Sequence, residues 1–302
     1  MTGARIDFRK YCVISIWFGC NNNCGICMLS KSRSILPAIG YEGFKKTVLD
    51  IMLKARFENL ILSGAEVTTF AELEKYVRFA ASLGWFNKVQ VQTNGRRLSD
   101  RSYLDRLVQA SVNEFFVSVH GFEATHDAAA GVPGAFGETL RGLRNLTGRG
   151  DVNVISNTVL TRDNLPEVAD FLRFLGREGV SEMHLWNYFP VDNGCPGDLV
   201  VSLGEICGLL PALGDVVREC GKPLVMKSFP LCLPAVAPVY LDSVFPETVL
   251  PDRFWQEFGK CGFGQCVHRS EGRCASVECW GLSAPYVRIN GDERNLLKPL
   301  DS

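Results

Sequence analysis

The sequence predicts an α/β protein: a partial (β/α)6 TIM-like barrel with a small Cys-rich C-terminal extension. Strand-like apolar runs recur roughly every thirty residues, which is the period of βα units. Amphipathic segments with helical spacing separate these runs. Because only six such units can be recognised and a closed barrel of this kind needs eight, we expect an open parallel sheet that is buried on both faces.

Each expected strand is a short apolar run bounded by turn residues. The six strands are expected at residues 11–17, 59–62, 88–92, 114–119, 153–159 and 182–187. Parallel strands of this kind end at a common edge of the sheet. In parallel barrels the chemistry gathers at the C-terminal ends of the strands, so the residues that follow each run are the first candidates for a site.

The expected helices alternate with the strands. They are expected at residues 41–56, 70–83, 98–110, 137–146 and 165–178. In the first of them, Phe44, Val48 and Ile51 recur with the spacing of one helix face. In the last, Pro166 follows Asp163 closely, and a proline in the first turn is typical of a helix start.

The pattern changes after residue 190. A stretch containing proline and glycine follows, and then one more helix is expected near residues 203–219. We therefore predict two domains, a barrel over residues 8–220 and a cysteine-rich extension over residues 221–302.

Composition excludes several classes of protein. Of the 302 residues, 46% are hydrophobic and 22% are charged, with a net charge of −1, so a nucleic-acid partner, which needs a basic patch, is not expected. The apolar runs are much shorter than a membrane span, and no secretory signal is visible, so no membrane partner is expected. Twelve cysteines in such a chain favour the cytoplasm, where thiols stay reduced and can bind metal.

Three of these cysteines form a closely spaced motif. Cys20, Cys24 and Cys27 follow the first expected strand with the spacing C-x3-C-x2-C, and no fourth cysteine follows within the next hundred residues. Three thiolates on a cluster of four irons leave one iron without a protein ligand, and this open position permits chemistry. A zinc knuckle is the alternative, but structural zinc sites usually take four ligands in paired spacing.

This motif, placed after a first strand, resembles that of the radical S-adenosylmethionine (SAM) superfamily. The resemblance implies a [4Fe–4S] cluster whose open iron binds the amino and carboxylate groups of SAM. It implies reductive cleavage of SAM to a 5′-deoxyadenosyl radical, which abstracts hydrogen from a substrate C–H bond. It also implies the partial-barrel fold and an electron donor of the flavodoxin or ferredoxin type. The family usually has an aromatic residue just before the third cysteine, whereas this chain has Ile26.

The following strand ends carry the residues expected to contact SAM. After the second strand, the run Ser63-Gly64-Ala65-Glu66 resembles the Gly-Gly-Glu-Pro-like turn of the family, which implies that Glu66 binds the SAM amino group. The later strand ends add small polar groups and one indole, namely Thr93, Asn94, Ser118, Asn157 and Trp186. Asn94 also suits an ordinary turn, and Trp186 also suits the core.

Two histidines follow the fourth strand. His120 and the pair His126-Asp127 suggest a catalytic dyad. We expect instead a structured surface turn with a histidine cap.

A second set of cysteines lies in the predicted extension. Five cysteines within fifty residues can close a four-thiolate iron–sulfur site: Cys232, Cys261, Cys266, Cys274 and Cys279. The set resembles the twitch and SPASM extensions of radical SAM enzymes, which implies an auxiliary cluster. We expect one auxiliary [4Fe–4S] cluster on Cys266, Cys274 and Cys279, with Cys232 or Cys261 as the fourth ligand. A zinc ribbon is the alternative, and His268 would favour it.

Two further cysteines, Cys207 and Cys220, lie on the last expected helix and are expected to pack there.

The resemblance thus implies a radical SAM enzyme that acts on a peptide in natural-product maturation, with the auxiliary cluster binding substrate or accepting an electron. A small-molecule biosynthetic intermediate is the alternative substrate. Because the first strand begins near residue 11, we expect no N-terminal domain that binds a leader peptide. A non-catalytic iron–sulfur or zinc scaffold is the hypothesis from another class, and the turn at residues 63–66 argues against it.

Overall fold

One parallel sheet organises the chain. The computed structural model describes residues 5–30, 32–190, 197–234 and 236–300. Nine strands form the sheet in the order β8-β7-β6-β5-β4-β3-β2-β1-β9, and every neighbouring pair is parallel. The strands are β1 (Tyr11–Trp17), β2 (Asn59–Gly64), β3 (Lys88–Thr93), β4 (Glu114–Ser118), β5 (Asn153–Leu160), β6 (Glu182–Asn187), β7 (Leu224–Lys227), β8 (Tyr240–Asp242) and β9 (Glu247–Val249).

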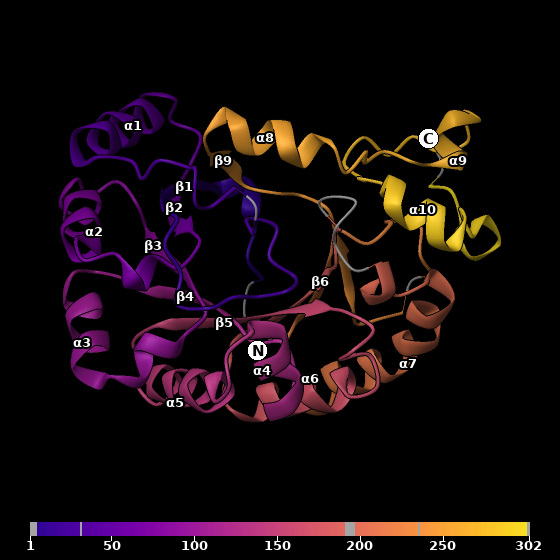
Figure 1. The fold of residues 1–302 in the computed structure, drawn as a ribbon, viewed down its shortest axis with the longest axis horizontal. Helices are drawn as coiled ribbons and strands as arrows, with labels where there is room; N and C mark the ends of the chain where they lie inside the picture. Colours follow the sequence, from indigo (N-terminus) through magenta and orange to yellow (C-terminus); the bar gives the residue numbers. More distant parts are fainter. Residues whose placement is uncertain (1–4, 31, 191–196, 235, 301–302) are drawn as a thin grey trace.

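Helices cover the outside of the curved sheet (Figure 1). They are α1 (Tyr41–Leu53), α2 (Leu73–Ser82), α3 (Arg101–Gln109), α4 (Glu123–Ala130), α5 (Ala135–Thr147), α6 (Val168–Arg177), α7 (Leu203–Cys220), α8 (Asp252–Gly259), α9 (Val267–Ser270) and α10 (Ala284–Asn290). Short 3₁₀ helices are η1 (Phe8–Lys10), η2 (Val67–Thr69), η3 (Arg96–Ser99), η4 (Gly197–Leu199) and η5 (Arg294–Leu296).

The predicted fold class, an open α/β partial barrel, is confirmed. The six predicted strands are present as β1 to β6, and each begins at the predicted residue. Three strands were not predicted: β7 and β8 extend the sheet beyond β6, and β9 pairs with β1 at the other edge. These three strands have only three or four residues, which is too short to show a periodic pattern. The division of the chain at residue 220 stays a prediction.

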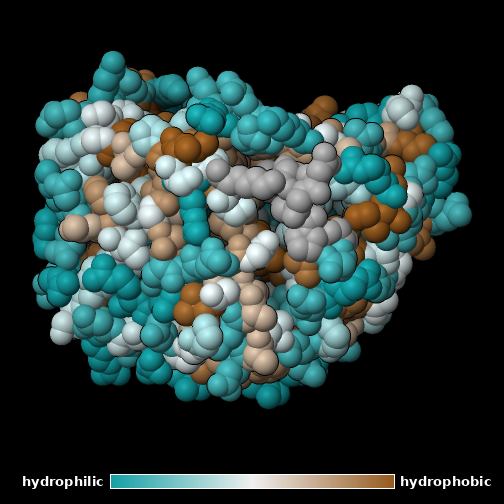
Figure 2. Space-filling view, viewed as in Figure 1, coloured by the Kyte–Doolittle hydropathy of each residue, from teal (hydrophilic) through white to brown (hydrophobic). Residues whose placement is uncertain are grey.

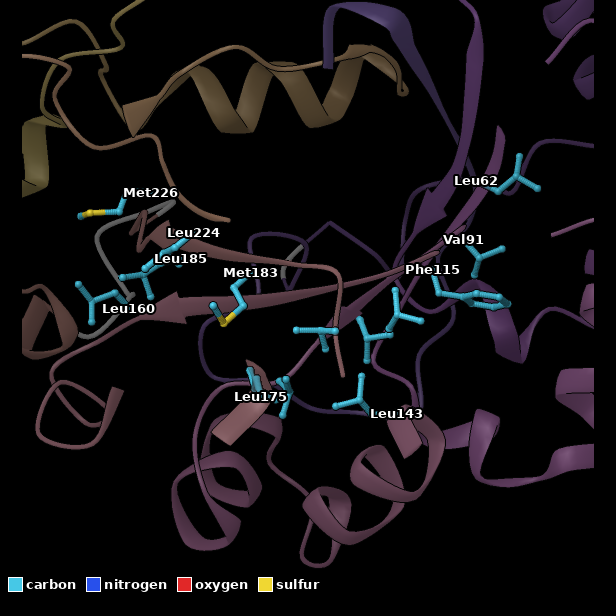
Figure 3. Close-up of a cluster of buried hydrophobic side chains, with 14 of the residues drawn as sticks. Leu62, Val91, Phe115, Leu143, Leu160, Leu175, Met183, Leu185, Leu224 and Met226 are labelled. Atoms are coloured by element: carbon cyan, nitrogen blue, oxygen red, sulfur yellow. The ribbon is translucent and has the colours of Figure 1, made fainter. Parts of the chain in front are cut away.

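The main core lies between the sheet and the outer helices. On β1, Cys12, Ile14 and Ile16 point into this core, because alternate residues of a strand face the same side. Figure 3 shows buried side chains of this core from the strands, including Leu62, Val91 and Phe115, and from the helices, including Leu143 of α5 and Leu175 of α6.

A smaller core fills the inside of the arc at the N-terminal ends of the strands. Phe8, Tyr11 and Val13 pack there with Phe116 and Ile155. The Tyr11 hydroxyl donates to the buried carboxylate of Glu114 at 2.8 Å. This packing fills the lower interior, so the open space of the barrel lies at the C-terminal ends of the strands.

The face seen in Figure 2 is largely hydrophilic, with hydrophobic residues in separate patches. Within the described residues, no helix combines the length and the apolar character needed to cross a membrane.

Candidate functional site

A cavity of about 290 Å³ opens at the C-terminal ends of the strands. It brings together every residue that the sequence analysis assigned to the first cluster and to SAM: Cys20, Cys24, Cys27, Ser63, Gly64, Ala65, Glu66, Thr93, Asn94, Ser118, Asn157 and Trp186. These residues come from six different strand ends or the loops after them. Their gathering follows from the parallel sheet, whereas their roles as ligands stay a prediction.

The cysteine loop after β1 is fixed by two arginines and an asparagine. Arg96 donates to the backbone oxygen of Asn21 and to Oδ1 of Asn22, the latter at 2.8 Å. Arg33 donates to the backbone oxygen of Asn22 at 3.1 Å. The side chain of Asn94 donates to Oδ1 of Asn21 at 2.7 Å. The asparagines between Cys20 and Cys24 therefore hold the loop to the end of β3.

Helix α4 supports the same loop from the other side. The Asn23 amide donates to the backbone oxygen of Ala130 at 2.9 Å. At the next residue, Gly131 has φ +64°, and a Cβ placed there would lie 2.3 Å from the backbone oxygen of Asn23. Only glycine allows this close approach between the end of α4 and the cysteine loop.

The turn after β2 packs against the end of β1. Gly64 has φ +143°, and a Cβ at this position would lie 1.9 Å from the backbone oxygen of Trp17. The amides of Ala65 and Glu66 donate to the backbone oxygens of Trp17 and Gly19, at 2.8 and 3.0 Å. Glycine is therefore required at position 64, which agrees with the glycine retained in the turn.

Glu66 is fully buried beside the cavity. Its Oε1 accepts hydrogen bonds from the backbone amide and the hydroxyl of Thr68 and from the hydroxyl of Thr93. Its Oε2 accepts one from the backbone amide of Asn94 at 2.6 Å. Burial raises the pKa of this carboxyl, and the hydrogen bonds oppose that rise. The carboxylate thus joins the ends of β2 and β3, and Oε2, with a single protein donor, keeps capacity for a cationic ligand.

The thiols of the cysteine loop line the cavity wall. Burial and the neighbouring thiols raise the pKa of Cys24 to about 12, and burial also raises the pKa of Cys20. Cys20 Sγ accepts a hydrogen bond from the Asn22 amide at 3.3 Å. A bound metal removes the thiol protons, so these pKa values describe the metal-free protein.

Cys20, Cys24 and Cys27 line one cavity. Within the described residues, no three Cys, His, Asp or Glu side chains converge closely enough to hold a single metal ion. A cubane cluster binds each thiolate at a different iron, so its ligands surround a space and do not meet at one point. Among the described residues, no fourth cysteine lines this cavity.

The two histidines do not form the expected surface turn. His126 lies on α4, both rings are buried, and both line the cavity. The Nδ1 of His126 accepts from the His120 amide at 3.0 Å, and the Nδ1 of His120 accepts from the Val159 amide at 3.2 Å. Burial lowers the pKa of His120 to about 3 and that of His126 to about 4, so both rings are neutral near pH 7.

Two buried polar atoms at this cavity have no hydrogen-bond partner: Nε2 of His126 and Oδ1 of Asn157. Since Nδ1 of His126 is an acceptor, its Nε2 carries the proton and is a donor. Buried polar groups in native proteins are nearly always paired. The sequence pattern assigned Asn157 to this site but did not assign His126 to it. Residues 123–130 form a short helix whose apolar periodicity is too weak to be recognised in the sequence.

The late cysteines form a second group. Cys232, Cys266 and Cys279 line one small cavity between the chain after β7 and the start of α9. Burial raises the pKa of the Cys232 thiol to about 12, and the charges of Cys279, Cys266 and Cys274 add to the rise. The Cys232 thiol therefore lies within electrostatic range of the three predicted ligands Cys266, Cys274 and Cys279. Cys261 is buried and, like Cys274, is not among the residues that line this cavity.

Backbone donors face one of these sulfurs. Cys279 Sγ accepts hydrogen bonds from the amides of Leu231 and Gly281, at 3.5 and 3.4 Å. An antiparallel bridge between Gln265 and Leu282 holds the stretch that carries Cys266 against the stretch after Cys279. Amides directed at sulfur are a common feature around iron–sulfur clusters, where they tune the potential.

The remaining pair behaves as expected. Cys207 and Cys220 pack against the main core from α7. None of the cysteines in the described residues forms a disulfide.

Comparison with known proteins gives a family match. Residues 14–175 match the model of the radical SAM superfamily. The chain is 30% identical over 183 residues to the AdoMet-dependent heme synthase of Methanosarcina barkeri, covering 60% of this chain and 51% of that protein. It is 30% identical over 188 residues to the "probable GTP 3′,8-cyclase" of Saccharolobus islandicus, covering 60% and 58%. The matches thus span only about half the length of these relatives.

Solved structures share the fold. Streptococcus suis SuiB bound to its precursor peptide SuiA gives a TM-score of 0.60 at 16% identity, covering 72% of this chain and 49% of SuiB. anSMEcpe with bound AdoMet and the Cp18Cys peptide gives 0.56 at 17% identity, covering 69% and 60%. Methylornithine synthase gives 0.55 at 14% identity, covering 81% and 75%.

Proposed function

Because this chain belongs to the radical SAM superfamily, whose enzymes use SAM and a [4Fe–4S] cluster, we propose that Cys20, Cys24 and Cys27 hold that cluster. When bound, the cluster supplies the electron that cleaves SAM to the radical which removes hydrogen from a substrate. The observation that carries the proposal is the single cavity lined by these cysteines and by all nine predicted SAM-contact residues.

The chain's own residues bind and orient SAM in this proposal. The Oε2 of Glu66 accepts a hydrogen bond from the SAM ammonium. The hydroxyl of Thr93 and the backbone amide of Asn94 hold the Glu66 carboxylate in place. Nε2–H of His126 and Oδ1 of Asn157 are a buried donor and a buried acceptor that the nucleoside or methionyl part of SAM would satisfy. Arg96 holds the cysteine loop in register with the end of β3.

A second cluster is the next part of the proposal. Cys232, Cys266, Cys274 and Cys279 would hold an auxiliary [4Fe–4S] cluster, since their thiols are near one another. Trp280, the neighbour of Cys279, belongs to a ring cluster with Phe245 and Phe258 that lines one cavity with Ser63 and Gly64 at the end of β2. This position suits a cluster that accepts the electron released after hydrogen abstraction.

The substrate that we propose is a peptide. SuiB, which was solved with its precursor peptide, and anSMEcpe, which was solved with a peptide, share the fold. A small-molecule intermediate is the second candidate, favoured by the names of the heme synthase and GTP cyclase relatives. We further propose a cytoplasmic location and a flavodoxin- or ferredoxin-type electron donor.

The test is to measure iron content and 5′-deoxyadenosine formation after anaerobic reconstitution. We expect roughly eight irons per chain in the wild type and roughly four in a Cys20/Cys24/Cys27→Ala triple variant, which should form no 5′-deoxyadenosine. A Cys207/Cys220→Ala variant is the matched control for loss of cysteine and should keep both. Continued 5′-deoxyadenosine formation by the triple variant would refute the assignment.

A further inference from the structure

A second cavity, of about 230 Å³, lies beside the first and is almost entirely apolar. Its wall combines the inner face of β1 with the cysteine loop and with residues from the C-terminal part of the chain. Seven aromatic rings contribute to it: Phe8, Trp186, Phe245, Phe254, Trp255, Phe258 and Trp280. An engineered apolar cavity of about 150 Å³ takes up benzene, so this space is large enough for a ring system.

The two cavities are continuous in their lining. Six residues face both, namely Met28, Leu29, Ser63, Gly64, Gln92 and Trp186. A group that fills the second cavity therefore lies directly beside the place proposed for SAM. The rim is open to solvent, because Met28 and Trp255 are 37% and 43% exposed.

Charge is missing from the wall of the second cavity. Of the side chains that line it in the described residues, none is ionisable, and the polar ones are Ser15, Ser63, Gln92 and Thr248. The nearest buried cation, Lys227, lies behind the rings of Phe8 and Phe245, at 4.5 and 5.1 Å from their centres. Its ammonium already pairs with Asp242 at 2.9 Å. A charged group placed in this cavity would be desolvated without a partner.

The rings of this wall pair with one another in specific geometries. Phe245 meets Trp186 edge-to-face with centroids 5.6 Å apart, and Phe258 meets Trp280 edge-to-face at 5.9 Å. Phe254 and Trp255 are also edge-to-face, at 5.2 Å. Aromatic pairs prefer this offset or edge-to-face geometry, so an incoming aromatic group gains specific contacts as well as burial.

From these observations we propose that this cavity binds the substrate through an uncharged aromatic side chain. The proposal rests on the proposed function, since it names the part of the substrate that lies next to SAM. It excludes substrates that would present a phosphate, carboxylate or ammonium group at this position.

Equilibrium dialysis of the reconstituted enzyme with SAM tests the proposal. The probes are N-acetyl-L-tryptophanamide, which resembles a residue within a peptide, and N-acetyl-L-lysinamide and N-acetyl-L-glutamate amide, which carry a charge. Free L-tryptophan, a zwitterion, represents a small-molecule source of the same ring. We expect at least tenfold tighter binding of N-acetyl-L-tryptophanamide than of either charged amide.

Two variants locate the binding. Trp255→Glu places a carboxylate at the exposed rim and should weaken binding of N-acetyl-L-tryptophanamide at least tenfold, whereas Trp255→Phe should retain most of it. Leu53→Glu is the matched control, since Leu53 is 84% exposed at the end of α1 and outside the cavity. Iron content and the thermal midpoint verify that each variant is folded.

Equal binding of the charged amides, or unchanged binding in Trp255→Glu, would overturn the proposal. Its failure is distinct from failure of the proposed function, which is read separately as 5′-deoxyadenosine formed without any probe. Preferred binding of free L-tryptophan over the blocked amide would keep the aromatic cavity and would contradict the peptide substrate.

Discussion

At the scale of single residues, the two oxygens of the Glu66 carboxylate have different roles. Its Oε1 accepts three hydrogen bonds from Thr68 and Thr93, which is more than the two lone pairs of one oxygen ordinarily accept, so this oxygen is fully used. Its Oε2 accepts only from the Asn94 amide. The residue therefore organises the turn with one oxygen and can bind a cation with the other.

Replacing Glu66 with glutamine should weaken SAM binding by about 1.5–3 kcal/mol, the value of a hydrogen bond to a charged group. Equilibrium dialysis of the reconstituted variant with SAM measures the change. Thr93→Val is the control, because it removes one donor to Glu66 and leaves the charge in place, so its effect should be smaller. An unchanged affinity in Glu66→Gln would restrict the residue to holding the turn.

The two buried histidines make stability sensitive to acid. Their folded-state pKa values, about 3 for His120 and about 4 for His126, lie below the ordinary value of 6.5. Below about pH 6.5, the two histidines therefore become protonated in the unfolded chain while they stay neutral in the folded chain. The stability associated with neutral histidine is fully present above that pH and declines as the pH falls toward the folded pKa values.

At pH 5.5, each histidine should cost about 1.4 kcal/mol of unfolding free energy relative to pH 7.5. Urea unfolding of the wild type and of His126→Gln at the two pH values measures this. Glutamine cannot be protonated, so the variant should lose less stability between the two pH values. An equal loss in both proteins would mean that His126 does not titrate differently on folding.

At the scale of elements, α4 connects the fourth strand end to the cysteine loop. The helix is short, yet its last residues contact the backbone of Asn23 through Ala130 and Gly131. His126 on this helix, and His120 just before it, also line the cavity. A helix that appears from its sequence to be a surface turn thus forms part of the support for the cysteines.

Gly131→Ala should disrupt this support, because the new methyl group would lie 2.3 Å from the Asn23 backbone oxygen. A displacement of about 1 Å in a catalytic arrangement can slow a reaction about 100-fold. We expect a loss of that order in 5′-deoxyadenosine formation, with less iron retained at the first site.

Gly134→Ala is the matched control. Gly134 has φ +78°, so alanine meets a comparable backbone strain, but no atom lies within 4 Å of the added methyl group. It should lose a little stability and keep its iron. Equal loss of iron in both variants would assign the effect to backbone strain and remove α4 from the site.

At the scale of the whole molecule, the sequence predicted the six central strands and the residues at their ends, because long apolar runs and parallel topology together determine where those ends meet. The same reasoning could not find β7, β8 and β9, which are too short to have a period. It also missed the anchoring of the cysteine loop by Arg33 and Arg96, since a charged residue on a turn looks like a solvated one. Long-range contacts of this kind leave no local pattern.

Sequence spacing also left open which cysteine, Cys232 or Cys261, would be the fourth ligand of the proposed auxiliary cluster. Cys232 comes from the chain after β7, whereas Cys261 lies much closer in sequence to the other three cysteines. Cys232 nevertheless lines one cavity with Cys266 and Cys279, and the charges of both and of Cys274 raise the pKa of its thiol. Cys232 would then connect the sheet to the end of the chain through the metal site.

Cys232→Ala should therefore remove roughly four irons per chain, and Cys261→Ala should remove none. Both cysteines are buried, at 5% and 1% exposure, so the two variants lose similar packing and differ in the sulfur that they remove. Iron and zinc content after anaerobic reconstitution, together with 5′-deoxyadenosine formed without substrate, are the measurements. The cluster proposed on Cys20, Cys24 and Cys27 would lie in the other cavity, so both variants should still cleave SAM. Iron lost from Cys261→Ala alone would give Cys261 the place proposed for Cys232, and zinc in place of iron would favour a structural ribbon.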